Sequence, residues 1–198
     1  MRAEVFYARF GTLLDRPPVE RHAGLLSLHA ETLAEYTAWV QAITPAAAAS
    51  LSSDGRPAAL VVGHIAAWDR FLVQACGEML SGAEWPSFMD LQGYLDEDGR
   101  RLDFESIDAF NAHHARLQRG LAWDGLRSAA LERAATAAAL FTAPDLLTAE
   151  RLERTRPVAW RLHGDRRAQA SVGWQIWMII MEHESVEHAA DLARAAAG

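Results

Sequence analysis

The sequence predicts an all-α fold: a four-helix bundle with a short N-terminal lead-in helix and a long crossover between its second and third helices. Three observations favour this architecture. Four long segments carry apolar residues every three or four positions, which is the spacing of one helix face. Prolines and turn residues separate these segments. No run alternates apolar and polar residues well enough to predict a sheet, so packed helices are the expected architecture.

Composition limits the classes of function. The chain has 198 residues, 51% of them hydrophobic and 23% charged, which supports one globular domain over residues 1–198. The net charge is −7 and no basic run occurs, so no nucleic-acid partner is expected. No apolar run approaches the roughly 20 residues of a membrane span, and no apolar leader opens the chain. Cys76 is the single cysteine, which excludes an internal disulfide. We therefore expect a cytoplasmic protein without a membrane partner.

The N-terminal part of the chain predicts two helices. Residues 3–14 have helical spacing and form the lead-in helix. Residues 19–43 form the first long helix, which Pro45 ends. His29 lies on its apolar stripe, where a single histidine is more typical of a hydrogen-bonded core residue than of a ligand. Residues 46–57 contain a Ser-Ser-Asp-Gly turn and are expected to be a connection.

The second long helix is predicted over residues 58–80, with His64 on its inward face. Gly63 costs the helix about 1 kcal/mol relative to alanine, so it indicates close approach by a neighbouring helix or a ligand. Cys76 has apolar neighbours and is expected to be a buried, inert thiol. Residues 81–103 combine proline, glycines and acidic residues, and they predict the long crossover.

The third helix is expected to begin near residue 104 with Asp103 as its N-cap, and it places His114 on its inward face. The helical pattern resumes over residues 126–141, where alanines favour helix and a proline follows. One or two further helical turns are expected after that proline. Residues 155–171 are expected to be a loop that leads into the last helix.

The last long segment, residues 172–193, is the one on which the chemical argument depends. An apolar helix of about six turns changes there, within one turn, into ionisable residues. At about 100° per residue, two stripes of side chains lie nearly opposite each other. One stripe consists of Trp174, Trp177, Met181, Glu184, His188 and Leu192, and the other of Val172, Ile176, Ile179, His183, Val186 and Ala190.

Two i,i+4 pairs on this helix compete as metal ligands. Glu184 and His188 are about 40° apart around the axis and share one stripe, while His183 and Glu187 form the second pair. His183 lies about 140° from His188 in an α-helix, so these two histidines are not expected to meet on one ion. The residues alone also allow an ordinary helix end with solvated charges.

No G-x-S-x-G motif, glycine-rich phosphate loop or C-x-x-C motif occurs, which leaves the histidines as the carriers of chemistry. Their sequence context resembles a known family. The segments VVGHIAAWDRFL, IDAFNAHHARL and MEHESVEHAADL are similar in pattern and order to the DinB/YfiT-like superfamily of bacterial bundle proteins. The similarity spans roughly residues 20–195.

The resemblance implies a metal-binding four-helix fold, with one histidine ligand from the second helix and an H-x-x-x-H pair from the fourth. Matched by position, His64 is the first ligand and His188 is the last. Glu184 stands where the pair has its first histidine, so the implied set is His64, Glu184 and His188. A site built on His183 and Glu187 is the alternative. Two imidazoles and a carboxylate suit Zn²⁺ with an open position, while Ni, Mn or Fe are alternatives.

Members of the superfamily include thiol transferases that use mycothiol or bacillithiol, a maleylpyruvate isomerase domain and hydrolases. The resemblance therefore implies a metal-dependent enzyme acting on a small molecule, either a thiol S-transferase or a hydrolase, without deciding between them. The alternative is a non-catalytic bundle that binds a hydrophobic ligand or a partner, which the aromatic and methionine content of the last helix favours. A homodimer is a secondary expectation, because the lead-in helix carries apolar residues outside the four-helix core, namely Val5, Phe6, Phe10 and Leu13.

Overall fold

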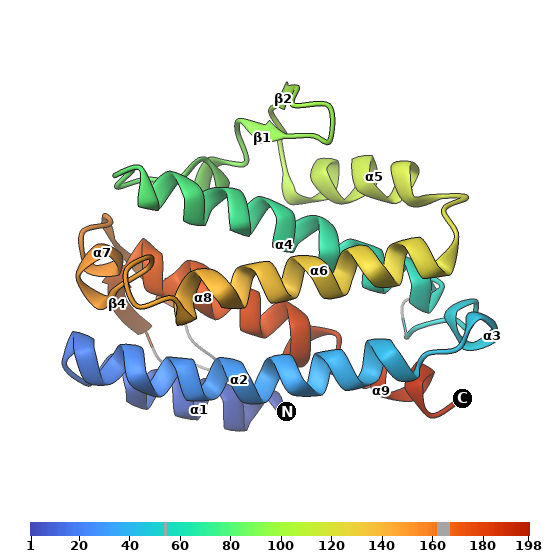
Figure 1. Ribbon diagram of the computed structural model, residues 1–198, viewed down its shortest axis with the longest axis horizontal. Coiled ribbons are helices and arrows are strands. Elements are labelled where there is room, and N and C mark those ends of the chain that lie inside the picture. Colours follow the sequence, from blue (N-terminus) through green and yellow to red (C-terminus); the bar gives the residue numbers. More distant parts are fainter. Residues whose placement is uncertain (54, 162–166) are drawn as a thin grey trace.

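The computed structural model describes residues 1–53, 55–161 and 167–198, and it confirms the predicted bundle of long helices (Figure 1). The helices before the last segment are α1 (Ala3–Leu14), α2 (Pro18–Ala42), α3 (Pro45–Ala48), α4 (Ala58–Leu80), α5 (Ile107–Gln118), α6 (Trp123–Thr142) and α7 (Ala149–Glu153). The last segment consists of α8 (Val172–Glu182), the π-helix η2 (His183–Glu187) and α9 (Ala189–Ala196).

The bundle is formed by α2, α4, α6 and the run from α8 to α9. In Figure 1, α2 and α8 run in one direction, whereas α4 and α6 run in the other. Because α4 and α6 are parallel neighbours, the chain needs a crossover between them. Helix α5 belongs to this crossover and lies along the outside of α4. Within the described part of the chain, no helix is both long and apolar enough to cross a membrane.

Helix boundaries follow local capping chemistry. The second long helix was predicted over residues 58–80, and α4 has these bounds. The predicted start of α5 near residue 104 is wrong by three residues, because Ser106 is the N-cap and its hydroxyl accepts a hydrogen bond from Ala109 N at 3.1 Å. Asp103 instead accepts from Gly93 N at 2.6 Å and so stabilises the crossover.

Two short hairpins correct the expectation that the chain contains no strands. The crossover holds the 3₁₀-helix η1 (Ser87–Asp90) and the antiparallel pair β1 (Tyr94–Leu95) and β2 (Arg101–Leu102). The segment expected as a loop contains β3 (Pro157–Arg161) and β4 (Arg167–Ser171), which pair in antiparallel register with Pro157 opposite Ser171. Residues 162–166 of that expected loop lie outside the described residues. Strands of two to five residues are too short for the alternation criterion to detect.

The lead-in helix α1 is part of the core. Phe6 and Phe10 are both 0% exposed, and the Phe10 ring meets Trp160 of β3 edge-on at 5.6 Å. These side chains therefore do not offer the free apolar surface from which a homodimer was expected, although Val5 remains 39% exposed. A homodimer stays a prediction that now rests on much less apolar surface.

Gly63 lets α5 approach α4 closely. A Cβ at this position would lie 2.6 Å from Gln118 Oε1, and Gln118 Nε2 donates a hydrogen bond to the Gly63 carbonyl at 2.6 Å. The neighbour that the sequence indicated is thus a helix. Further along α4, Cys76 is fully buried, and burial raises the pKa of its thiol, as expected for an inert cysteine.

Candidate metal centre

Three histidine side chains converge between α4 and the last helical run, and we call them the histidine cluster. One ring nitrogen from each of His64, His183 and His188 lies within 4.8 Å of the other two. The His64 ring centroid is 5.8 Å from that of His183 and 5.1 Å from that of His188, while the last two are 6.1 Å apart. Among the residues that the structure describes, this is the group in which three or more His, Cys, Asp or Glu side chains bring their ligand atoms this close together.

The π-helix η2 explains why His183 and His188 meet. In an α-helix, side chains five positions apart diverge by about 140°, which is why the sequence predicted that they would not share an ion. Hydrogen bonds in a π-helix join residues five apart, so residues i and i+5 face the same side. His183 opens this turn and His188 directly follows it. The expected separation of the two histidines was therefore wrong, because it assumed a continuous α-helix.

The cluster opens into a cavity of about 620 Å³, a size suited to a small organic molecule. All three histidines line it, and the Trp68 ring stacks on His183 with centroids 5.7 Å apart. Its apolar wall comes from α4, α8 and the crossover and consists of Trp68, Phe88, Met89, Leu91, Ile107 and Ile179. Polar groups on the same wall are Arg56, Asn111, Gln175, Glu182 and Glu187.

Burial sets the charge of the groups around the cavity. Desolvation is the main cause that lowers the pKa of both His183 and His188, although the nearby Glu187 carboxylate opposes it. Both imidazoles are therefore neutral near pH 7, which is the form that binds metal ions. Burial, helped by the charge of Glu187, raises the pKa of Glu182 to about 7.

Glu184 does not join the histidine cluster. It shares the buried face of Trp177 and Met181, as the stripe predicted, and all three are 0% exposed. Its carboxylate, however, does not line the cavity, and Oε2 lies 3.8 Å from His29 Nε2. The structure thus brings together two residues of the expected set, His64 and His188, and supplies His183 in the place expected for Glu184.

Glu184 belongs instead to a second group, which we call the buried polar cluster: His29, Tyr36, Asp69 and Glu184. All four are at most 2% exposed. Trp177 Nε1 donates a hydrogen bond to His29 Nδ1 at 3.0 Å, so His29 is the bonded core residue that the sequence predicted. Burial lowers the pKa of His29 to about 4, and the neutral ring carries its proton on Nε2, facing Glu184.

The buried polar cluster contains several polar atoms without hydrogen-bond partners in the described part of the chain. They include both carboxylate oxygens of Asp69, both of Glu184, and the Tyr36 hydroxyl. Burial, followed by the mutual repulsion of the two carboxylates, raises the pKa of Glu184 well above its ordinary range. Burial also raises the pKa of Asp69, and Arg133 opposes that shift.

The histidine cluster fits a divalent ion. A tetrahedral zinc site with Zn–N bonds of about 2.0–2.1 Å keeps its ligand nitrogens about 3.3 Å apart. Nitrogens that lie within 4.8 Å of one another therefore need to approach by about 1.5 Å at most. His188 Nε2 is buried and has no hydrogen-bond partner among the described residues, so this atom breaks no hydrogen bond when it binds an ion.

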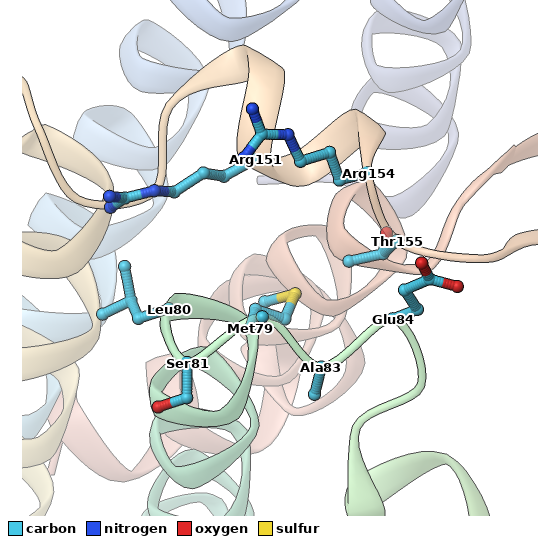
Figure 2. A pocket seen from close by; sticks show the side chains of 9 residues that line it. Met79, Leu80, Ser81, Ala83, Glu84, Arg151, Arg154 and Thr155 are labelled. Atoms are coloured by element: carbon cyan, nitrogen blue, oxygen red, sulfur yellow. The ribbon is translucent and has the colours of Figure 1, made fainter.

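The polar groups of a second cavity, at the C-terminal end of α4, already form hydrogen bonds with the backbone. It measures about 420 Å³ and lies between the end of α4 and α7 (Figure 2). Arg151 on its wall donates from Nη1 to the carbonyls of Asp145 at 2.7 Å and Leu146 at 2.6 Å. Thr155 Oγ1 donates to the Leu152 carbonyl at 2.8 Å. These groups already hold the backbone, and none of the three histidines lies here.

His183 is the member of the cluster that sequence reasoning assigned to a different pair. A signal was present in the sequence, because two histidines and three glutamates occupy the seven positions 182–188. What the sequence does not show is the π-turn, which lies within the core, since Glu184 and Ser185 are both 0% exposed.

Comparison with known proteins supports the fold. No family model matches the sequence, and no curated protein matches it. The structure matches the crystal structure of a histidine-to-alanine mutant of the mycothiol-dependent maleylpyruvate isomerase with a TM-score of 0.60 and 14% sequence identity. The match covers 91% of this chain and 62% of that chain, so this chain spans less than two thirds of the isomerase's length. The chain therefore shares the helical fold of that isomerase structure, and its own three histidines could hold a metal ion.

Proposed function

We propose that this protein is a metal-dependent enzyme that acts on a small molecule, with His64, His183 and His188 holding a divalent ion. The observation that carries this proposal is the convergence of three imidazole nitrogens within 4.8 Å at the wall of a 620 Å³ cavity. Three protein ligands leave a coordination position open toward that cavity. A divalent ion held there would supply a Lewis acid that makes a nucleophile available near neutral pH.

The chain's own residues would bind and orient the substrate. The apolar wall around Trp68 and Phe88 suits the apolar part of a small molecule and excludes water from it. Trp68 Nε1 donates a hydrogen bond to Asn111 Oδ1 at 2.9 Å, which fixes the amide so that its NH₂ group can meet a ligand acceptor. Glu182 on the same wall is a candidate for accepting or donating a proton near pH 7.

The reaction class that we propose is transfer of a low-molecular-weight thiol to an electrophile, with hydrolysis as the second candidate. The name of the structural match supports the first, because that isomerase is described as mycothiol-dependent. Zn²⁺ is the proposed ion, because three imidazoles with an open position form a common catalytic zinc site. Ni²⁺, Mn²⁺ and Fe²⁺ are the alternatives to be offered in the test.

The test is the metal content of protein purified without a polyhistidine tag. We expect about one ion per chain by elemental analysis, either as purified or after Zn²⁺, Ni²⁺, Mn²⁺ and anaerobic Fe²⁺ are offered. Retention of an apolar dye in the cavity with no bound metal under any of these conditions would contradict the proposal. It would favour the alternative, a non-catalytic bundle that binds a hydrophobic ligand. A thiol-transfer screen on the loaded protein then separates transferase from hydrolase.

A further inference from the structure

Neighbouring residues of the π-turn point into different clusters. His183 lies in the histidine cluster and lines the cavity, whereas Glu184 lies in the buried polar cluster. Both residue types bind divalent metal ions. The turn therefore decides which of two adjacent ligand types is presented beside His64 and His188.

The helix type sets this choice. In the π register, the residue five positions before His188 shares its side, and that residue is His183. In the α register, the residue four positions before it shares its side, and that residue is Glu184. A change of one residue in the hydrogen-bonding register would thus exchange an imidazole for a carboxylate.

The contacts of Glu184 allow it to leave its present position. Both of its carboxylate oxygens are buried and have no hydrogen-bond partner among the described residues, so its departure breaks no hydrogen bond. It would also separate two buried carboxylates, because Asp69 lies in the same cluster. His183 Nε2 lies 3.4 Å from Glu187 Oε2. An i,i+4 pair of this kind is compatible with an α-helix, so His183 can keep Glu187 as its partner after it leaves the metal centre.

The non-helical backbone at His188 allows the change of register to end before α9. His188 has φ −105° and ψ 7°, which is not helical, and it stands between η2 and α9. A register change within residues 183–187 can therefore end at this residue, while Leu192 and Ala195 of α9 keep their buried positions. π-turns of this kind are rare and occur frequently at functional sites.

We propose that the segment His183–Glu187 is a register switch that exchanges the third ligand of the metal centre between His183 and Glu184, while His64 and His188 bind in both states. This inference rests on the proposed function. The exchange replaces a neutral imidazole ligand by an anionic carboxylate ligand, so the total charge of the metal centre changes by one unit.

The test compares metal affinity and ligand type in His183→Ala, Glu184→Gln and the double variant. Each single variant should retain one Zn²⁺ per chain with affinity within about tenfold of the parent, and the double variant should lose at least about 100-fold. X-ray absorption on the zinc-loaded proteins should report three imidazoles in Glu184→Gln, and two imidazoles with one carboxylate in His183→Ala. Glu187→Gln leaves every proposed ligand in place but removes the carboxylate that receives His183 in the α register, so this variant should keep one Zn²⁺ with three imidazole ligands.

Loss of metal from either single variant, with the helical signal retained, would show a fixed ligand set and overturn the switch. The same conclusion would follow if His183→Ala kept its metal with only two protein ligands. If His183→Ala fails to fold, His183→Gln replaces it, because it keeps the polarity and most of the volume. A parent protein that binds no metal at all would overturn the proposed function itself, which is a different outcome from the loss of metal in one variant.

Discussion

The two ends of α4 both carry cavities with polar walls, but they differ in what those polar groups already do. At the C-terminal end, Arg151 and Thr155 donate to backbone carbonyls of the chain's own turns. Near the N-terminal end, imidazoles converge, and the buried His188 Nε2 has no hydrogen-bond partner among the described residues. On α4, His64 of one cavity and Met79 of the other are about 15 residues apart, or roughly 22 Å along the helix axis.

The two cavities therefore differ in how readily their polar groups can bind a ligand. A polar group that is already hydrogen-bonded stabilises the fold, and a ligand would have to replace that bond before it could bind. A buried polar atom without a partner costs stability in the absence of a ligand, so its presence requires another explanation. The histidine end of α4 meets this criterion and the arginine end does not, although both cavities have room for a small molecule.

The largest effect is expected from His188→Ala, which tests the histidine end directly. His188 belongs to the proposed ligand set in both registers of the turn, so its removal leaves at most two protein ligands. We expect metal affinity to fall at least about 100-fold, measured by competition with a chelator. Circular dichroism should show the parent's helical signal, because the ring is at the cavity wall rather than in the apolar core. Unchanged metal affinity in this variant would move the centre away from the histidine cluster.

Much of the fold was predictable because helical spacing is a local signal. The bounds of α1 and α4 match the predicted ranges, and the inward positions of His29 and His64 on long amphipathic helices were read from the same spacing. Glu184 was also placed correctly on the buried stripe of Trp177. Helix bounds and inward-facing positions can be predicted from the sequence because the apolar spacing of each helix repeats over several turns.

The rest depends on contacts that are distant in sequence. The hairpin of β3 and β4 is stabilised by packing of Trp160 against Phe10, 150 residues earlier, and not by its own pattern. The π-turn likewise is not encoded in the spacing of residues 182–188, and one added residue in a turn moves a side chain to another face. The ligand set of His64, Glu184 and His188 therefore stays a prediction, next to the set that includes His183.

A smaller effect on stability is expected when the pH is lowered. His114 allows the loss of folding stability to be distinguished from the release of metal. Burial, with a further contribution from the charge of His113, lowers the pKa of His114 to about 4, against 6.5 in an unfolded chain. Between these values the unfolded chain binds a proton that the folded protein does not, so the free energy of unfolding falls as the pH decreases.

Between pH 7 and pH 5 this group should contribute no more than about 2 kcal/mol of lost stability. His114→Gln should therefore lose less stability than the parent over that range in urea denaturation. Metal release on acidification should be the same in both proteins, because His114 lies outside the histidine cluster. Equal loss of stability in the parent and the variant would show that His114 does not stay neutral in the fold.

The smallest effect is expected at the arginine end of α4, where Arg151→Ala tests whether that cavity serves only the fold. The guanidinium donates to two carbonyls in the turn that follows α6, and its removal leaves those acceptors to water. We expect the free energy of unfolding to fall by about 1 kcal/mol, because the Leu146 carbonyl is partly buried and the Asp145 carbonyl is exposed. Arg151→Lys keeps the charge but not the fork of donors, so it should recover only part of this loss.

Metal content should equal the parent's in both variants. A fall in metal content or in turnover after either substitution would mean that the two ends of α4 are coupled, and that hydrogen-bond satisfaction alone does not identify the functional cavity.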